Sequence, residues 1–551
     1  MNEQSPEYDV LILGSGLAGS LTAAILARHG AKVMLIDAAQ HPRFAVGEST
    51  TPQTVEWLYI LAERYDVPEI RALTSAKSVN RDIAATSGVK SNFGFVYHHP
   101  GQEPDPREAT QFALPKIFLQ NGHLFRQDTD SYMFHVAVKY GARARQNWRA
   151  TDIDFDDDGV SVTGGRDGEV LRARYLVDAS GFRSMLADKF DLRDTRTALK
   201  HHARGMFNHY VGVTPFDEVS GHPKELRPPK DWHTGTLHHV FERGWLWIIP
   251  FDNHQGSNNL LCSVGLTIDE RTYPRPADLT PQQEFDSFLD RYPAIKRQFT
   301  DARPVREWVS AGRMQYSSRQ TVGDRWCLMS HAAGFIDPLF SRGLSNTFEI
   351  VDALSARLIG ALKDGDFSAE RFAYVEELEH GLIKWNDELV NTCYIGFDHP
   401  RLWNAVFRLW GAMVTPATMR LTRARLRFVR DGDPAHFEEL EKSPHPGLWW
   451  PTDSFKNLIE QVAETCEKYE AGQTTADEAA DRVFTLLQES EVVNPVFGWK
   501  DEQQRFIWPD LRTMARFLYW ASAQAPPELR QVGREFLMGI VKAGSRVRKL
   551  L

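Results

Sequence analysis

A glycine-rich turn between two short apolar segments is the feature that most constrains the fold of this chain. The segment 8–13 is apolar, Gly14, Gly16 and Gly19 follow it, and an alanine-rich stretch leads to a second apolar segment that ends at Asp37. This order predicts strand, turn, helix and strand, which is one βαβ unit. In such a unit the glycines serve a tight turn, close approach of the backbone to a pyrophosphate and helix packing, while the acid accepts hydrogen bonds from ribose hydroxyls. The sequence therefore predicts dinucleotide binding, with an ordinary glycine turn in an α/β core as the alternative.

Further patterns extend this unit along the chain. Residues 160–178 alternate around Gly-Gly and Asp-Gly turn signals and predict strands that return to the nucleotide sheet, and residues 322–329 predict another strand. A glycine-flanked helix start at 332–344 is a second place where backbone N–H groups can meet an anion. From about Phe348 the periodicity is helical, with predicted breaks near Pro400, Pro416, Pro444–Pro451 and Pro495. A second glycine fingerprint is absent from the sequence, so we predict one nucleotide.

Composition excludes several classes of protein. Hydrophobic residues make up 42% and charged residues 25% of the 551, which excludes intrinsic disorder. The net charge of −9 provides no global positive field, so we expect neither nucleic acid nor an anionic membrane as a partner. Four widely spaced cysteines without a C-x-x-C pair indicate no disulfide framework, and scattered histidines indicate no metal site. We read no export signal and no membrane span, and we expect a reduced cytoplasm.

Four segments together resemble the flavin-dependent halogenases. They are the fingerprint at 14–19, His-Pro-Arg-Phe-Ala-Val-Gly-Glu-Ser at 41–49, Gly-Trp-Leu-Trp-Ile-Ile-Pro at 244–250 and Asp-Pro-Leu-Phe-Ser-Arg-Gly at 337–343. The segment 87–103 and the long helical tail are most similar to the pyrrole 3-halogenases of the pyrrolnitrin pathway. The resemblance implies an α/β fold with a Rossmann-like FAD-binding domain of the flavin monooxygenase and halogenase type. A β-sheet substrate domain is inserted in it, and a mostly helical cap follows.

The implied domains are an FAD-binding core over residues 1–365, with its substrate-side sheet within about 80–130 and 200–315, and a helical region over 366–551. The resemblance also implies the chemistry. Reduced FAD, supplied by a separate NAD(P)H-dependent flavin reductase, takes up oxygen as a hydroperoxide, and chloride or bromide attacks it to release hypohalous acid. This oxidant then travels through a tunnel to an active-site lysine.

Site residues are carried over from the family by matching motifs. The lysine is Lys90, with Lys77 as a weaker candidate, and the backbone N–H groups of Arg342 and Gly343 are expected to bind chloride. Trp245 and Trp247 are expected to separate the flavin from the substrate. The expected cofactor-binding residues are Gly14, Ser15, Gly16, Ala18, Gly19, Asp37, Arg43, Glu48, Arg126, Asp337 and Leu344.

Two positions depart from the family pattern. Arg342 stands where a small residue is common, and its side chain could add positive field for the halide. Phe340 replaces the glutamate with which tryptophan halogenases stabilise a cationic ring intermediate. The chain therefore predicts a pyrrole, phenol or aniline-like ring whose own heteroatom delocalises the charge, and His98 and His99 are candidate bases beside Lys90.

Three alternatives remain open from the sequence. One is a flavin-dependent hydroxylase of aromatic rings, and another is a flavoprotein that binds a biosynthetic intermediate without catalysis. The third is a halogenase whose substrate is tethered to a carrier protein, although a free small aromatic substrate is favoured. Arg420, Arg423, Arg427 and Arg430 form a basic stripe at helical spacing. The stripe is either a solvated face paired with Glu438, Glu439 and Glu441 or a docking surface for an acidic carrier.

Overall fold

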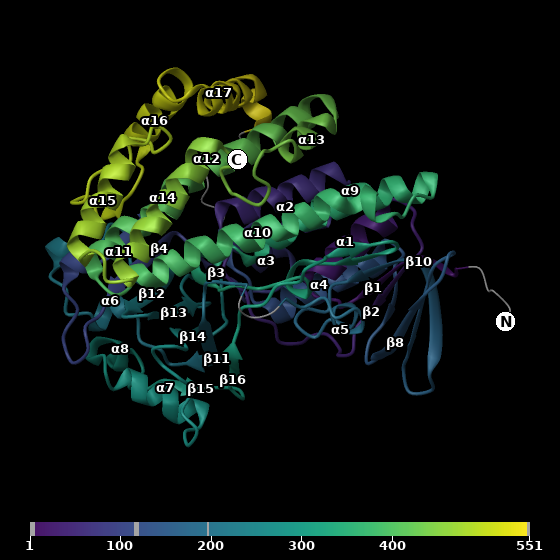
Figure 1. The fold of residues 1–551 in the computed structure, drawn as a ribbon, viewed down its shortest axis with the longest axis horizontal. Helices are drawn as coiled ribbons and strands as arrows, with labels where there is room; N and C mark the ends of the chain where they lie inside the picture. The colour runs from purple at the N-terminus through teal and green to yellow at the C-terminus, as the bar shows by residue number, and fades with distance from the viewer. Residues whose placement is uncertain (1–5, 115–120, 195–197, 548–551) are drawn as a thin grey trace.

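Two large β-sheets lie side by side, and long helices run across them (Figure 1); a small third sheet pairs two short strands. The computed structural model describes residues 6–114, 121–194 and 198–547. In Figure 1 the sheet of the amino-terminal unit is on the right and the second sheet is on the lower left. Helix α10 (Ala369–Gly396) extends over both sheets, whereas α9 (Gly343–Asp364) packs on the amino-terminal side.

The first sheet is built on the predicted βαβ unit. Its strands, in spatial order, are β17 (Val322–Gly323), β18 (Trp326–Leu328), β10 (Glu169–Asp178), β1 (Tyr8–Leu13), β2 (Val33–Ile36) and β7 (Arg143–Arg145), with β9 (Val160–Gly164) pairing β10 and β8 (Ala150–Phe155) pairing β9. β1 is parallel to both β2 and β10, and β10 is parallel to β18. Strands buried on both faces need apolar side chains throughout, which is why β1 reads as a continuous apolar run. The predicted strands near 160–178 and 322–329 are confirmed.

Helix α1 (Leu17–Arg28) follows the glycine turn and packs against α4 (Arg126–Lys139). Gly19 allows the helix to lie directly on the turn, because a Cβ there would be 1.9 Å from the carbonyl oxygen of Gly14. This contact fixes the start of α1 at the carboxyl ends of β1 and β2, where open α/β sheets bind their ligands.

The second sheet lies mostly within the predicted substrate-side segments. Its strands, in spatial order, are β15 (Arg303–Pro304), β11 (Ala203–Val211), β14 (Cys262–Asp269), β13 (Gly244–Pro250), β12 (Thr236–Phe241), β4 (Asn92–Tyr97), β5 (Thr110–Ala113) and β19 (Phe506–Ile507), with β16 (Val309–Arg313) beside β11. Side chains alternate across β13: Trp245 and Trp247 join the core beneath the cap helices, and Leu246 and Ile248 join the opposite core. The two tryptophans therefore share one face, as predicted.

The carboxyl-terminal part forms the predicted helical cap. It comprises α10, α11 (Pro400–Val406), α12 (Arg408–Asp431), α13 (Ala435–Glu441), α14 (Asp453–Glu470), α15 (Ala476–Glu489), α16 (Leu511–Ala523) and α17 (Pro527–Val547). The prediction of a break at Pro416 is wrong, because this proline lies inside α12. Residues 408–419 are buried, and packing of α12 against its neighbours outweighs the lost backbone hydrogen bond. The predicted boundary at 365/366 falls between α9 and α10.

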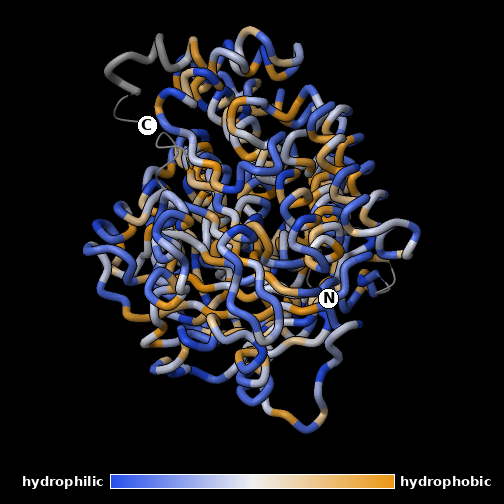
Figure 2. Tube along the Cα trace, turned by 90° about the vertical axis from the view of Figure 1, so that its left-hand side faces the viewer, coloured by the Kyte–Doolittle hydropathy of each residue, from blue (hydrophilic) through white to orange (hydrophobic). Residues whose placement is uncertain are grey.

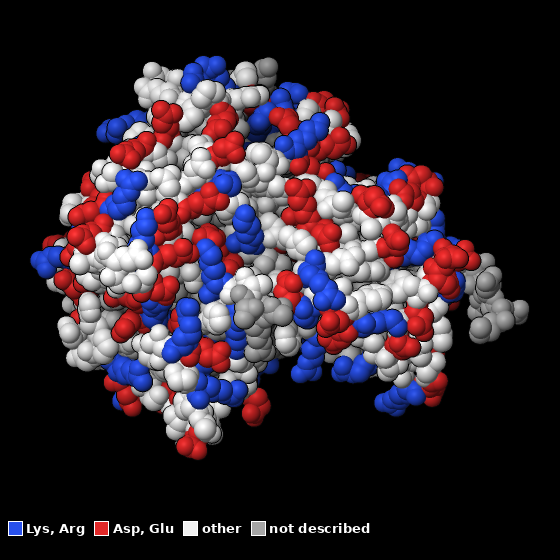
Figure 3. Space-filling model, viewed as in Figure 1, with Lys and Arg blue, Asp and Glu red and all other residues white. Residues whose placement is uncertain are grey.

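The cap and the second sheet share one hydrophobic core, which contains aromatic residues of β4 and β13 together with Trp403 and Trp410. Apolar and polar stretches alternate along the chain trace in Figure 2, as expected for amphipathic elements around such cores. Figure 3 shows acidic and basic side chains interspersed over the face that it presents. Within the described ranges, no helix has the length and apolarity to cross a membrane, and no cluster of three or more His, Cys, Asp or Glu residues could hold a metal ion.

Shorter elements connect these parts. They are β3 (Gly88–Val89), β6 (Gly122–His123), α2 (Pro52–Arg64), α3 (Ala76–Asp82), α5 (Met185–Lys189), α6 (Phe216–Val219), α7 (Pro281–Leu289) and α8 (Pro293–Gln298).

Candidate active site

A cavity of about 580 Å³ opens at the carboxyl ends of β1 and β2. Seven of the predicted cofactor residues line it: Gly14, Gly16, Ala18, Asp37, Arg43, Arg126 and Leu344. Gly14 adopts a φ of +95°, and a Cβ there would lie 2.4 Å from the carbonyl oxygen of Ala179. The result is a side-chain-free cradle at the start of α1, where N–H groups suit a pyrophosphate. These residues fit FAD.

Asp37 is held as a carboxylate at the edge of this cavity. Its Oδ2 accepts hydrogen bonds from the Ser15 N–H at 2.8 Å and the Ser15 hydroxyl at 2.7 Å, and it lies 2.9 Å from Nη2 of Arg43. Burial alone would raise the pKa of Asp37, but Arg43 and the N–H groups of Ser15 and Ala39 lower it below its usual range. An ionised acceptor at the end of β2 suits ribose hydroxyls.

The remaining predicted cofactor residues are absent from the lining of this cavity. Ser15 supports Asp37, Gly19 packs on Gly14, and the Oε1 of Glu48 lies 2.7 Å from Nε2 of His209. Trp148, Arg149 and His331 line the cavity and were missed, because no local motif marks them.

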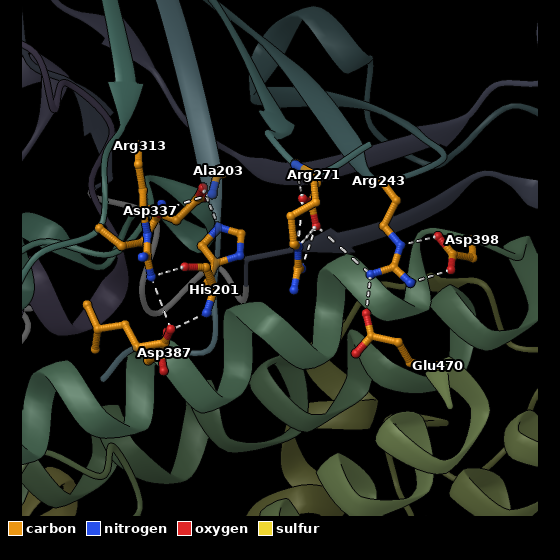
Figure 4. A network of polar contacts seen from close by, with 12 residues as sticks. His201, Ala203, Arg243, Arg271, Arg313, Asp337, Asp387, Asp398 and Glu470 are labelled. Atoms are coloured by element: carbon orange, nitrogen blue, oxygen red, sulfur yellow. Dashed lines mark hydrogen bonds and ion pairs between the residues drawn. The ribbon is translucent and has the colours of Figure 1, made fainter. Parts of the chain in front are cut away.

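Asp337 belongs to a buried polar network between the second sheet and the cap (Figure 4). Its Oδ2 accepts a hydrogen bond from the Tyr394 hydroxyl at 3.1 Å and lies 3.3 Å from Nε2 of His201. Its Oδ1 accepts from the N–H of Leu339 at 2.9 Å, which holds the turn that follows. Asp387 of α10 accepts the N–H of His201 at 3.0 Å, so the network joins the cap to the strand side of the site.

Lys90 lies between two segments that are far apart in the sequence. Its side chain is buried, and Nζ donates to the hydroxyl of Ser49 at 2.6 Å and to the hydroxyl of Ser341 at 3.2 Å. The Nζ also lies 3.6 Å from the centre of the Phe93 ring. Burial lowers the pKa of Lys90 well below its usual value. The competing candidate, Lys77, is exposed on α3.

The turn beneath Lys90 has an unusual backbone. Phe340 and Ser341 both have positive φ values, 65° and 57°. Such conformations cost of order 1–3 kcal/mol in residues other than glycine and cluster at functional sites. The turn directs the Ser341 hydroxyl to Lys90 and begins α9 at Gly343.

An aromatic wall lies on the other side of this turn. The Phe340 ring stacks on Trp410 with ring centres 4.5 Å apart and an interplanar angle of 11°. Phe95 and Trp403 lie within 6.5 Å of the same ring. Trp403 and Trp410 come from the cap, which therefore contributes to this wall.

Trp245 and Trp247 continue a row of rings along the second sheet. Their ring centres are 5.5 Å apart, and Trp247 stacks on Phe207 at 5.9 Å. Phe207 in turn stacks on Phe44, which precedes the cavity-lining Ala45. At the other end of the row Trp245 lies 5.3 Å from His238. The row thus extends from beside the cavity toward the aromatic wall.

Arg342 and Gly343 begin α9, and the first N–H groups of a helix have no acceptor within the helix. A Cβ at Gly343 would lie 3.7 Å from Nε2 of His331, whose ring borders the cavity. Leu344, the next residue, lines the cavity, whereas Arg342 and Gly343 are not among its lining residues. The Arg342 side chain instead stacks on Trp449, with its guanidinium 4.4 Å from the ring centre.

The hypothesis that His98 or His99 acts beside Lys90 is wrong. His98 follows β4 and its Nε2 lies 2.8 Å from Nδ1 of His239, while His99 lies 3.0 Å from a carboxylate oxygen of Glu108. Eight residues of extended chain separate His98 from Lys90, about 26 Å. His123 and His238 are the histidines whose pKa is lowered by burial and by the nearby Lys90 charge.

Burial of Lys90 predicts a pH-dependent cost in stability. The pKa of Lys90 is lower in the folded protein than in the unfolded chain, so between these two pKa values the unfolded chain binds more protons. The free energy of unfolding therefore rises with pH until about 10.5, the usual pKa of lysine. We expect Lys90→Met to raise the free energy of unfolding at neutral pH by about 1 kcal/mol or more and to flatten this rise. Urea unfolding from about pH 7 to about pH 10 measures both effects. A variant less stable than the wild type at neutral pH would contradict the expectation.

The Rossmann-like unit, the glycine cradle and the adjoining second sheet define an FAD-dependent enzyme of the monooxygenase and halogenase class. A family model described as an FAD binding domain matches residues 7–314. The tetracycline 7-halogenase of Kitasatospora aureofaciens is 54% identical over 95% of this chain and 94% of its own length. The monodechloroaminopyrrolnitrin halogenase PrnC of Pseudomonas fluorescens is 44% identical over 96% and 94%. The chain belongs to the flavin-dependent halogenase family.

A solved structure agrees with this assignment. Halogenase PltM in complex with phloroglucinol and FAD superposes with a TM-score of 0.88 at 35% identity, over 91% of this chain and 99% of that one. The protein is an FAD-dependent aromatic halogenase that uses a halide co-substrate. The comparisons support this function over an aromatic hydroxylase and over a flavoprotein without catalytic activity. The resemblance to the pyrrolnitrin-pathway enzymes is confirmed, and the tetracycline 7-halogenase shares a larger fraction of identical residues.

Proposed function

We propose that the protein chlorinates or brominates a free, electron-rich phenol or pyrrole ring in antibiotic biosynthesis, with Lys90 as the catalytic residue. One observation carries the proposal. The Nζ of Lys90 is buried at the junction of the Gly47–Ser49 segment and the turn at 340–343, with one hydrogen bond to each. The same turn leads directly to Leu344, which lines the flavin cavity, and its Phe340 belongs to the aromatic wall.

Each remaining predicted residue has a place in this proposal. Bound reduced FAD supplies the oxygen-activating chemistry that converts halide into hypohalous acid. The N–H groups of Arg342 and Gly343 hold the halide at the positive end of α9. Trp245 and Trp247 keep the organic substrate away from the flavin. The predicted cofactor residues that line the cavity bind FAD, and Ser15, Gly19, Glu48 and Asp337 support its walls from behind.

Lys90 directs the oxidant to one ring carbon. As an ammonium group, Nζ donates a hydrogen bond to hypohalous acid and makes its halogen more electrophilic. As a neutral amine, Nζ takes the halogen while the bond between halogen and oxygen breaks, and the departing hydroxide takes a proton from nitrogen, which leaves a haloamine and water. Burial lowers the pKa of Lys90 and so favours the neutral amine more than in an exposed lysine. Ser49 and Ser341 orient Nζ in either case.

The proposed substrate class follows from the aromatic wall that the substrate would contact. Phe340, Phe95 and Trp410 bring aromatic carbon, and no carboxylate, to the place of the family glutamate. A ring that needs charge stabilisation by the protein would be attacked slowly there, whereas phenols and pyrroles stabilise the cation themselves. Tetracycline and phloroglucinol, which the names of two relatives contain, both carry phenol rings.

Competition between substrates tests this function. Phenols or aryl-pyrroles and free tryptophan are supplied at equal concentration with FAD, a flavin reductase, NADH and chloride, and free hypochlorous acid is scavenged. We expect a phenol or pyrrole to be chlorinated at one position at least about tenfold faster than tryptophan. Efficient chlorination of tryptophan at a single position, lost in Lys90→Met, would reject the proposed substrate class.

Two further parts of the proposal concern the setting of the enzyme. A separate NAD(P)H-dependent flavin reductase supplies reduced FAD, because one dinucleotide fingerprint serves one bound nucleotide. A control without reductase should therefore give no product from NADH or NADPH.

The protein works in the cytoplasm, where its four buried free cysteines stay reduced. Residues 1–365 act as the FAD-binding core and 366–551 as the cap.

A further inference from the structure

A second, small cavity lies on the opposite side of the first turn of α9 from the flavin cavity. Leu344 and Thr347 face the flavin cavity, whereas Arg342, Asn346 and Glu349 face the small one. Trp57, Trp410 and Trp449 form much of its remaining wall. Its volume of about 30 Å³ is enough for one small ion with little water. We refer to it as the α9 cavity.

Two guanidinium groups without carboxylate partners line the α9 cavity. Arg342 is 7% exposed, and its polar contact is a 3.4 Å hydrogen bond to the side-chain oxygen of Asn386. Arg420 donates to the carbonyl oxygen of Leu440. Among the described residues, neither forms an ion pair. Burial lowers the pKa of Arg342 to about 10, which reflects the cost of an uncompensated charge there.

Glu349 is the acidic residue in the lining of this cavity. Burial raises its pKa to about 7, against the opposing effect of Arg420 and Arg342, so near neutral pH it carries a partial charge. The other ionisable groups that act on it are Asp352 on α9 and Tyr374 on α10. Two full positive charges therefore face less than one negative charge, and the α9 cavity is positive.

The α9 cavity adjoins a groove of about 180 Å³ on the outside of α12, because Arg420 lines both. Arg423 and Arg427 in this groove are ion-paired with Glu439 and Glu535. This pairing confirms that Glu439 is a partner of the basic stripe. Among the arginines described in these two spaces, the positive charges without an ion-pair partner are therefore those of Arg420, which lines both spaces, and of Arg342, which lies further inside at the start of α9.

We propose that the α9 cavity binds the halide co-substrate, chloride or bromide, on a path from the α12 groove to the turn at Arg342 and Gly343. A weakly hydrated anion suits a small site that contains two guanidinium groups and is otherwise lined largely by tryptophan rings. The inference rests on the halogenase function. It is tested by halide binding, which can be measured without turnover.

Kinetics of charge variants test the path. Arg420→Gln should raise the KM for halide about tenfold, as expected for the loss of one charged hydrogen bond, with little change in kcat at saturating halide or in the KM for the aromatic ring. Arg420→Lys should restore most of the affinity. Glu349→Gln should lower the KM for halide at about pH 8, where the wild-type carboxyl is ionised. Arg430→Gln removes a charge from the same helix outside both spaces and should have no effect.

Anomalous scattering from bromide in crystals locates the ion directly. We expect a peak between Arg342 and Arg420 in the wild type that is lost in Arg420→Gln. A peak without any change in the KM for halide would mean an adventitious ion only, and an empty cavity at saturating bromide with unchanged KM would equally overturn the proposal. A protein that shows the peak but never halogenates would keep the anion site and reject the proposed function.

Discussion

Replacement of Lys90 by methionine should reduce halogenation at least about a hundredfold while oxidation of reduced FAD by oxygen continues. Methionine is only one atom shorter than lysine but offers hypohalous acid neither a hydrogen-bond donor nor a nitrogen to accept halogen. Ser49 and Ser341 then have no group to position. Oxidant formation precedes this step and should be unaffected.

Product is measured by mass spectrometry, and FAD oxidation by stopped-flow absorbance. Lys77→Met is the matched control, because it removes an exposed lysine from α3 and should leave both rates unchanged. The expected gain in stability of Lys90→Met makes unfolding an inadequate explanation for lost activity. A variant that retains more than about a tenth of the wild-type rate would remove Lys90 from the mechanism.

Substitution of Gly14 by alanine should weaken FAD binding at least about a hundredfold, or about 3 kcal/mol. The φ of +95° disfavours alanine, and the new Cβ would lie 2.4 Å from the carbonyl oxygen of Ala179, so the backbone that lines the cavity must move. Titration of the apoprotein with FAD, followed by fluorescence, gives the Kd, and circular dichroism reports whether the fold persists.

Gly30→Ala separates backbone strain from the clash. Gly30 has a similar φ of +86°, but a Cβ there would meet nothing within 4 Å. We expect this control to lose about 1 kcal/mol of stability and to bind FAD normally. A folded Gly14→Ala protein whose Kd for FAD stays within about threefold of the wild type would contradict the assignment of the cradle.

The nucleotide unit was predictable because its determinants are local. Apolar runs of strand length, three glycines at fixed spacing and one acid at the end of the second strand lie within about thirty residues, as in dinucleotide-binding βαβ units. Alternation in β13 likewise placed Trp245 and Trp247 on one face. Short-range periodicity is sufficient for such features.

The surroundings of Lys90 could not be predicted in the same way. Ser49 is 41 residues and Ser341 is 251 residues away in the sequence, and neither belongs to a pattern that includes a lysine. Trp410 contacts Phe340 from α12 of the cap, 70 residues further along the chain, and no local pattern links the two residues. The prediction that His98 lies beside Lys90 failed because residues several positions apart along an extended segment lie far apart in space.

The Arg342 side chain illustrates the limit of a motif. The motif places its backbone at the start of α9 beside the flavin cavity, but the side chain leaves in the opposite direction and stacks on Trp449. Only the packed cap shows that the guanidinium faces a second, positive space. The α9 cavity is therefore formed by tertiary contacts between helices that are distant in the sequence.

A single-turnover experiment tests the central claim most directly, namely that this site transfers halogen to an electron-rich ring under the control of Lys90. Protein loaded with reduced FAD is mixed with oxygen, a phenol or aryl-pyrrole and chloride, with a scavenger of free hypochlorous acid present. High-resolution mass spectrometry then distinguishes added chlorine from added oxygen. We predict one monochlorinated isomer that requires chloride and is absent with Lys90→Met. A hydroxylated product that forms equally without chloride, or the mixture of isomers that free hypochlorous acid gives, would contradict the account.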